Sequence, residues 1–321
     1  MKRALLCSAF AALLTGCGLC PSPPSAATGT AARYPITDVA SAPATPVRNQ
    51  AKSGTCWAFG GVSLIESEAI RTRRCTPDLS EMWVVRHAYF EKAVKYVRTR
   101  GRVAFDQGGE IQDVLWLVDR YGIVPQSLYE GGAADGTYDH ASLAKAIRRL
   151  AKRIVDKKLY EKEHWQRMID EELDRRLGAR PDRFVIDGVA YTPFSYADSI
   201  GFRRDDYVAL TSFTHHPFFE RFVLEIPDNW AAHATLNIPL DSLMRLLDSA
   251  LAAGYTAAWD ADVSERGFGR RAGIALLPQQ EGRITLPAPE IVVDQPLRQR
   301  ILHLFADGTA QVTGAEFAAA G

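Results

Sequence analysis

Cysteine, net charge and long apolar runs are all scarce in this sequence. Its 321 residues include 5 cysteines, too few for a small disulfide-stapled scaffold. The 38 basic residues balance the 38 acidic ones, so no global field draws the chain to nucleic acid or to an anionic membrane. No apolar run is long enough to cross a bilayer. The remaining composition, 47% hydrophobic and 24% charged, is that of a globular protein with room for about two domains.

The N-terminus resembles a secretory leader. Two basic residues precede an apolar run, Ala4–Leu14, which has the length of a signal-peptide core. The following Leu14-Thr15-Gly16-Cys17 resembles a bacterial lipobox, the motif whose cysteine is lipidated and becomes the first residue. We therefore expect residues 1–16 to be a lipoprotein signal peptide, and a lipid on Cys17 to anchor the protein in the bacterial cell envelope, on the periplasmic or extracellular face. A plain signal peptide cut elsewhere is the alternative.

Residues 17–47 predict a tether between the lipid and a folded domain. The stretch Pro21–Pro46 holds six prolines and many small residues, with little to bury. After processing, Cys20, Cys56 and Cys75 remain, an odd number, so at least one thiol has no partner within the chain. A Cys20–Cys75 disulfide is conceivable in an oxidising compartment.

The segment around Cys56 predicts a reactive cysteine at a helix start. Small and apolar residues recur at helical spacing after Gly54-Thr55, and Thr55 is a candidate N-cap. A helix N-terminus favours a thiolate over a thiol through its free N–H groups and its dipole. Gln50 lies six residues upstream, where its amide could donate to an oxyanion beside Cys56.

The run Gln50-x5-Cys56-Trp57-Ala58-Phe59 resembles the cysteine motif of papain-like peptidases. The resemblance implies that Cys56 is the catalytic nucleophile, that Gln50 is an oxyanion donor and that the substrate is a peptide. We also assign Trp57, next to the nucleophile, to substrate binding. No cofactor is implied. The alternative is a small buried cysteine at a helix start.

Later landmarks resemble one branch of that family, the bleomycin hydrolase/aminopeptidase C group. They are Leu79-Ser80-Glu81 with Trp83, Asp106-Gln107-Gly108-Gly109-Glu110 and Tyr121-Gly122-Ile123-Val124-Pro125. In papain-like enzymes the glycine pair lets an extended substrate hydrogen-bond to the enzyme backbone, because a side chain there would block the approach. We therefore assign Gly108 and Gly109 to substrate binding. Alone, they would indicate only a turn.

The implied fold is α+β and two-lobed, papain-like, with a helical insertion and an incomplete β-rich lobe. We place the helical lobe with the nucleophile at 48–138, the insertion at 139–200, a partial β-rich lobe at 201–300 and a divergent tail at 301–321. Ile111–Asp119 predicts an amphipathic helix within the helical lobe.

Two apolar stripes predict a helical hairpin in the insertion. One stripe comprises Leu143, Ile147, Leu150 and Ile154, and the other Trp165, Ile169, Leu173 and Leu177. Seven Lys or Arg residues fall within residues 145–158, so a basic adaptor that binds nucleic acid or membrane is an alternative. Acidic residues follow at once, which favours an ordinary solvated helix face and no nucleic-acid partner. The insertion is short for the group, so the oligomeric state is left open.

In the second half, Tyr207–Ser212 predicts a strand followed by a turn, and a helix is expected from Pro239 through Leu251. Tyr255–Trp259 predicts a buried strand, with Trp259 either a pocket wall or a core residue. His215-His216 suggests a metal, but adjacent side chains of an extended chain point in different directions, and no spaced ligand set completes a site. We therefore predict a structural role for this pair and no metal site.

The family's general base and its partner are missing from the sequence. In this family the histidine lies in a run that resembles Asp-His-x-Met or Thr-His-Ala-Met, and an Asn-Ser-Trp motif follows; neither run is present. The last histidine is His303 and the last asparagine is Asn237. We expect a truncated or frameshifted end and an impaired peptidase. The alternative, from another class, is a peptide-binding lipoprotein without catalysis.

Overall fold

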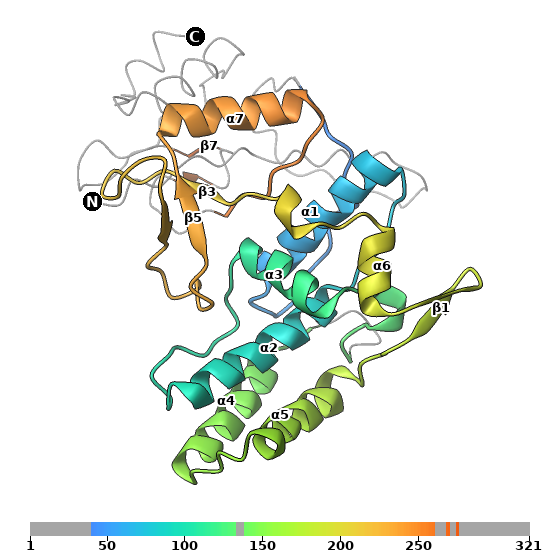
Figure 1. The fold of residues 1–321 in the computed structure, drawn as a ribbon, viewed down its shortest axis with the longest axis vertical. Helices are drawn as coiled ribbons and strands as arrows, with labels where there is room; N and C mark the ends of the chain where they lie inside the picture. Colours follow the sequence, from blue (N-terminus) through green and yellow to red (C-terminus); the bar gives the residue numbers. More distant parts are fainter. Residues whose placement is uncertain (1–39, 133–137, 261–267, 270–273, 276–321) are drawn as a thin grey trace, which may run out of the picture. The chain divides into compact units, whose positions relative to one another are not determined.

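Figure 1 shows a computed structural model of the chain, in which residues 40–132, 138–260, 268–269 and 274–275 are described. The chain divides into two units. One comprises 40–239 and 245–260, and the other includes 240–244 and the described residues beyond 260. Helices and small sheets are mixed, which confirms the α+β prediction. The predicted signal peptide, Cys17, the tether up to residue 39 and the tail 301–321 lie outside the described residues.

The first unit is mainly helical. Its elements up to residue 206 are α1 (Cys56–Arg73), α2 (Glu81–Arg98), α3 (Ile111–Tyr121), η1 (Gln126–Leu128), α4 (Ala141–Asp156), α5 (Lys162–Leu177), β1 (Phe184–Ile186), β2 (Val189–Tyr191), α6 (Pro193–Ser199) and η2 (Arg204–Asp206). The predictions of a helix from Cys56 and of one over Ile111–Asp119 are confirmed.

Side-chain caps explain where two of these helices begin. The hydroxyl of Ser80 accepts the Trp83 N–H at 3.0 Å and so caps α2. At α3, Glu110 and Asp113 form a reciprocal capping box, in which the Asp113 carboxylate accepts the Glu110 N–H at 2.9 Å. The residues before the apolar periodicity therefore fix the helix starts.

The predicted helical hairpin is present and packs against α2 (Figure 1). The apolar stripes of α4 and α5 are buried at Ile147, Ile154, Ile169 and Leu173. These residues belong to the same buried cluster as Trp57 beside the nucleophile. One buried cluster therefore includes residues on both sides of the predicted boundary at residue 138, and that boundary stays a prediction.

One buried arginine joins the hairpin to α2. The Arg86 side chain is fully buried and donates to Asp170 at 2.9 Å and to Asp174 at 2.6 Å, both on α5. Its Nε and Nη1 atoms find no acceptor within the described residues. The guanidinium is thus compensated by two carboxylates on one side only.

The range 139–200 is not helical throughout. After α5, β1 and β2 form an antiparallel hairpin in which Ile186 pairs with Val189. Asp187 (φ 49°) and Gly188 (φ 79°) form its two-residue turn. Both residues have positive φ, as a turn that matches the strand twist requires. The predicted helical insertion at 139–200 therefore also contains a strand pair.

A three-stranded sheet lies further along the first unit. β3 (Leu210–Thr211) runs parallel to β5 (Ala234–Asn237), and β4 (Arg221–Val223) pairs antiparallel with the other edge of β5. The strand predicted at Tyr207–Ser212 is present but short.

The predicted strand Tyr255–Trp259 is wrong. These residues form no strand, and Tyr255 is 45% exposed. No described strand pairs with them, and without such a neighbour an apolar run has no sheet to join.

The helix predicted through Leu251 is α7 (Leu240–Ala252), which spans the division between the units. In the second unit, β6 (Phe268–Gly269) pairs with β7 (Ile274–Ala275). Among the described helices, none combines the length and apolar character of a membrane span.

Candidate active site

Cys56 is the first residue of α1, and its thiol is free and exposed. Thr55 occupies the N-cap position but does not cap the helix with its side chain. Its buried hydroxyl instead pairs with the Ser53 hydroxyl at 2.6 Å. The predicted position is right and the predicted cap bond is wrong, because the preceding loop uses the hydroxyl.

Gln50 lies in the tight loop that precedes Cys56. Its Nε2 donates to the Ser53 carbonyl at 2.6 Å, and the Ser53 hydroxyl donates back to the Gln50 carbonyl at 2.7 Å. One amide N–H therefore orients the Gln50 side chain, and the second remains for another acceptor. The oxyanion role of Gln50 stays a prediction.

Gln107 links this loop to the glycine pair. Its Oε1 accepts the Gly54 N–H at 2.8 Å, and its backbone carbonyl accepts the Trp57 indole N–H at 3.0 Å. In the sequence Gln107 stands out only as part of a motif, and this bridge was not predicted. A glutamine directly before Gly-Gly in a loop was the available signal.

The space over both glycines is occupied by the chain itself. A Cβ on Gly108 would lie 2.0 Å from an oxygen of Asp228. A Cβ on Gly109 would lie 2.8 Å from the indole of Trp57, which is buried. Close packing therefore accounts for glycine at both positions. The substrate-binding roles of Gly108, Gly109 and Trp57 stay predictions.

Lys92 supports the glycine pair from α2. Its buried Nζ donates to the Gly108 carbonyl and, at 3.1 Å, to the Asp106 carbonyl. Burial lowers the pKa of Lys92 to about 8, and the carboxylates of Asp106, Asp113 and Asp228 oppose that change. No local sequence pattern indicates that this lysine turns inward, so its role was not predicted.

Carboxylates and one imidazole gather around the start of α3. Burial, followed by repulsion from Asp260, Asp113 and Asp228, raises the pKa of Glu110 to about 7. His233 Nε2 lies 3.2 Å from the buried Asp113 carboxylate. A carboxyl group with such a pKa, here that of Glu110, can hold and release a proton near neutral pH. Sequence reasoning missed this group, whose members lie far apart along the chain.

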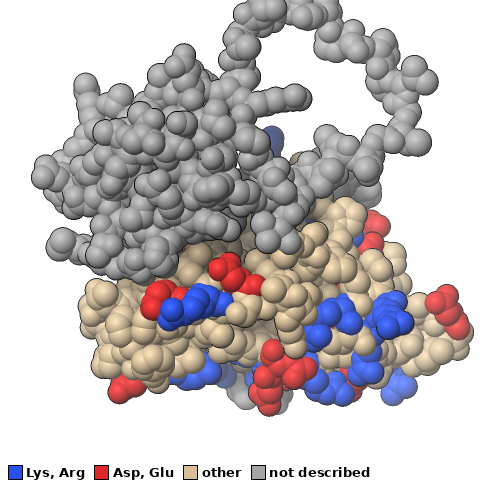
Figure 2. All heavy atoms as spheres, turned by 90° about the horizontal axis from the view of Figure 1, so that it is seen from above, with Lys and Arg blue, Asp and Glu red and all other residues tan. Residues whose placement is uncertain are grey.

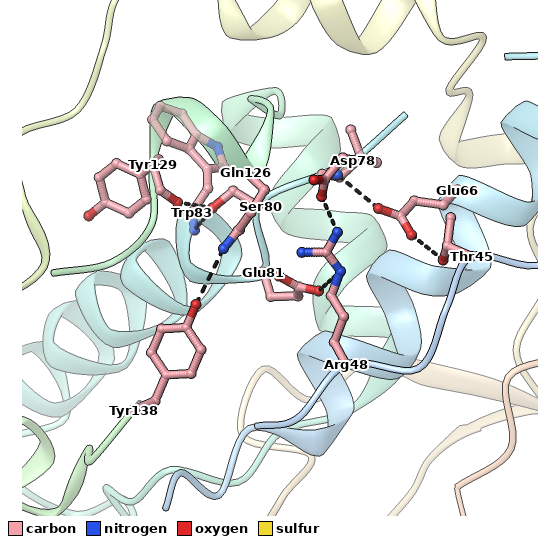
Figure 3. A network of polar contacts seen from close by, with 11 residues as sticks. Thr45, Arg48, Glu66, Asp78, Ser80, Glu81, Trp83, Gln126, Tyr129 and Tyr138 are labelled. Carbon is pink, nitrogen blue, oxygen red and sulfur yellow. Dashed lines mark hydrogen bonds and ion pairs between the residues drawn. The ribbon is translucent and has the colours of Figure 1, made fainter. Parts of the chain in front are cut away.

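A polar network fastens the segment that leads to Gln50 (Figure 3). Thr45 donates to Glu66 on α1 at 2.5 Å. Arg48 lies between Asp78 and Glu81, with Nε 3.5 Å from the Glu81 carboxylate. Burial raises the pKa of Glu81 to about 7, against the attraction of Arg48. The backbone before the nucleophile is thus held by side chains of α1 and α2.

The basic run on α4 is solvated. All seven Lys and Arg side chains within residues 145–158 are exposed. Lys152 pairs with Asp156 at 2.6 Å within the helix. Figure 2 shows acidic and basic side chains interspersed on the visible face of the described residues. This arrangement favours the solvated face over the nucleic-acid or membrane alternative.

Comparison with protein families matches residues 35–168 to the model of the papain family cysteine proteases. These residues include Gln50, Cys56 and the glycine pair. The comparison with curated proteins found no match.

Among solved structures, the chain resembles PepW from Lactobacillus rhamnosis HN001, with a TM-score of 0.55 and 19% sequence identity. The match covers 69% of this chain and 60% of the PepW chain, so our chain spans about three-fifths of that protein. The fold is therefore that of the papain-like cysteine peptidases. The papain-family match itself covers residues 35–168, less than half of the chain.

Proposed function

We propose that this protein is a cysteine peptidase with Cys56 as its nucleophile. The observation that carries the proposal is the exposed, free Cys56 thiol at the start of the 18-residue helix α1, within a papain-family match. The Cys56 sulfur would attack the peptide carbonyl carbon, and the Gln50 amide and the Cys56 N–H would hold the oxyanion. The C–N bond then breaks, the amine leaves with the proton that the Cys56 thiol gave up, and water hydrolyses the acyl-enzyme to the acid and the free thiol.

We propose further that this protein hydrolyses its peptide substrates slowly. It contains neither of the family's histidine runs nor an Asn-Ser-Trp motif, so no residue is assigned as the base that ionises Cys56. Losing members of a catalytic set that act together lowers kcat by several powers of ten. A dipole and one amide donor alone would support only residual chemistry.

The substrate class we propose is peptides cut from their N-terminus. The support is the run of landmarks that resembles the aminopeptidase C group. Hydrolysis of aminoacyl coumarin amides should exceed that of the same amides with a blocked amino group. Equal rates on both substrates would favour an internal cut instead.

The decisive experiment is active-site labelling of the full chain. An epoxide that needs an imidazole-paired thiolate should modify Cys56 only if a base is present, whereas iodoacetamide should modify the exposed thiol in either case. Under this proposal Cys56→Ser removes turnover and the iodoacetamide adduct at residue 56, and Cys75→Ser, at a half-buried free cysteine, preserves them. Turnover that survives Cys56→Ser would refute the assignment.

The second candidate function is peptide binding without hydrolysis. The absence of the family's histidine and asparagine runs favours it. Saturable peptide binding that Cys56→Ser leaves unchanged, with no turnover and no epoxide adduct, would establish this alternative.

We propose that a lipid on Cys17 anchors the protein in the bacterial cell envelope. The support is the lipobox-like Leu14-Thr15-Gly16-Cys17 after a signal-like apolar run. Metabolic labelling with a clickable fatty acid should mark the wild-type chain in the membrane fraction. Cys17→Ala should abolish the label and Cys20→Ala should not. A label that persists in Cys17→Ala would exclude this anchor.

A further inference from the structure

We propose that His215, His216 and Glu225 form a binding site for a divalent transition-metal ion of the zinc class. One ligand atom from each side chain lies within 4.8 Å of the others. Two imidazole nitrogens and one carboxylate oxygen are a donor set that Zn²⁺ accepts in proteins. The expectation of no metal at the histidine pair rested on an extended chain and on the lack of a third ligand; the two histidines lie in a turn, and Glu225 supplies a third donor.

The two histidines lie in a turn, where adjacent side chains can converge. Residues 214–216 form a turn and bend between β3 and β4, and the His215 and His216 ring centres are 4.5 Å apart. Glu225 follows β4 by two residues and brings its carboxylate to the same place. The spacing of His215, His216 and Glu225 in the sequence matches no usual metal-ligand pattern, so this arrangement could not be predicted from it.

A buried asparagine shapes the turn that carries the histidines. Asn237, at the end of β5, donates through Nδ2 to the carbonyls of Phe213 at 2.9 Å, His216 at 3.0 Å and Pro217 at 3.1 Å. Its Oδ1 accepts the Phe213 N–H at 2.8 Å. The fully buried Asn237 side chain therefore fixes the turn before any ion arrives.

A second asparagine shapes the segment around Glu225. Asn229, also buried, donates through Nδ2 to the carbonyls of Leu224 and His233, each at 3.0 Å. The backbone on both sides of the cluster is thus held by side chains that are not ligands. Outer partners that orient a metal's ligands are a usual part of such sites.

Aromatic packing alone does not explain the cluster. His216 stacks on Phe222, with ring centres 3.9 Å apart and planes 18° apart, so its ring has a packing role. Its Nε2 is nevertheless buried without a hydrogen-bond partner in the described part of the chain. A metal ion would satisfy that nitrogen and would explain why the Glu225 carboxylate approaches two imidazoles.

The fit to zinc requires only side-chain movement. In a tetrahedral site with bonds of about 2.1 Å, neighbouring ligand atoms lie about 3.4 Å apart. Rotation of the exposed His215 and Glu225 side chains can bring a separation of at most 4.8 Å to that value. A water molecule would complete the fourth position. The bound ion would tie the turn before β4 to the segment that follows it.

The test is metal titration of the full chain carrying Cys56→Ser, which removes the exposed thiol as a competing ligand. After dialysis against a chelator, Zn²⁺ is titrated in competition with a chromophoric chelator, and Co²⁺ is used as an optical reporter. We expect one equivalent of tight binding, Co²⁺ bands without thiolate charge transfer, and a rise in Tm with Zn²⁺. Each of His215→Ala, His216→Ala and Glu225→Gln should weaken binding at least about tenfold.

Matched controls are His164→Ala, at an exposed histidine on α5, and Glu220→Gln, at an exposed glutamate before β4. Both should bind as the parent does. Because Glu225 is exposed, Glu225→Gln should fold even if His216→Ala does not, which circular dichroism without metal will check. Binding that all three cluster variants leave unchanged would overturn the proposal. So would a dissociation constant for Zn²⁺ weaker than about 100 µM.

Discussion

The backbone N–H of Gly54 donates a 2.8 Å hydrogen bond to Oε1 of Gln107, 53 residues further along the chain. Because the Gln107 carbonyl also accepts the Trp57 indole N–H at 3.0 Å, one residue contacts the chain on both sides of Cys56. The side chain and the backbone carbonyl of Gln107 therefore connect the segment before the glycine pair to the residues on either side of the nucleophile.

Gln107→Ala should lower the rate at which iodoacetamide modifies Cys56 and should cost about 1 kcal/mol of unfolding free energy. The reason is that the Gly54 N–H loses its acceptor and the loop loses its orientation. Mass spectrometry of the adduct and urea unfolding measure the two effects. Gln107→Glu keeps an accepting oxygen and should lie nearer to the wild type. If Gln107→Ala behaves like Gln166→Ala on α5, the bridge has no such role.

Lys92 should make the unfolding free energy of the protein increase with pH in the alkaline range. Its pKa is about 8 in the folded protein against a usual 10.5, so the unfolded chain binds the extra proton between these values. The stability contribution of Lys92 therefore rises as pH increases from about 8 to 10.5, by up to about 3 kcal/mol.

The measurement is urea unfolding of wild type and Lys92→Met at several pH values. The wild type should gain stability relative to the variant over that range. Lys145→Met, at an exposed lysine of α4, should show a flat difference. A wild type that loses stability relative to Lys92→Met as pH rises would contradict the burial argument.

The contribution of Glu81 to the unfolding free energy should fall as pH rises through the acid range. Burial raises its pKa from 4.5 to about 7, so the folded protein binds a proton that the unfolded chain has released. Its contribution is fully present below about pH 4.5 and is lost as pH rises through 7, by up to about 3 kcal/mol. The difference in unfolding free energy between wild type and Glu81→Gln should fall over this range. Glu171→Gln, at an exposed position of α5, serves as the flat reference.

Removing the two carboxylates that pair with Arg86 should lower the unfolding free energy more than replacing Arg86 itself with an apolar residue. Asp170→Asn with Asp174→Asn leaves the fully buried guanidinium unpaired, and we expect a loss of about 3–5 kcal/mol. Arg86→Met removes the charge and keeps the volume, so its cost should be smaller. Unfolding of both variants in guanidinium chloride shows which one loses more unfolding free energy. As a control, Arg148→Ala on α4 should stay within about 0.5 kcal/mol of wild type. The reverse order would show that the arginine is stabilising by its own packing.

Local periodicity was enough to predict α1, α3, α7 and the α4–α5 hairpin. In each helix the apolar residues recur every three to four positions, and this spacing can be read from a short stretch of sequence. The β1–β2 hairpin was missed although Asp187-Gly188 between apolar residues is a strong turn signal. The strand expected at Tyr255–Trp259 failed because a strand depends on a neighbour, which composition alone does not supply.

The candidate site divides in the same way. Cys56 and Gln50 are close in sequence, so the position of Gln50 in the loop just before the helix that begins at Cys56 could be predicted. Lys92 and Gln107 contribute through contacts with residues that are distant along the chain, and no local pattern encodes those contacts. The convergence of His215, His216 and Glu225 likewise depends on the remote Asn237.

One buried apolar cluster extends from Trp57, beside the nucleophile, through Ile169 on the α4–α5 hairpin to Phe202. A core without an internal boundary melts as one cooperative unit. Proteolysis within the hairpin and exposure of the residues around Cys56 should therefore follow the same denaturation curve. The hairpin cannot be trimmed as a module in an engineered minimal enzyme without unfolding the nucleophile helix.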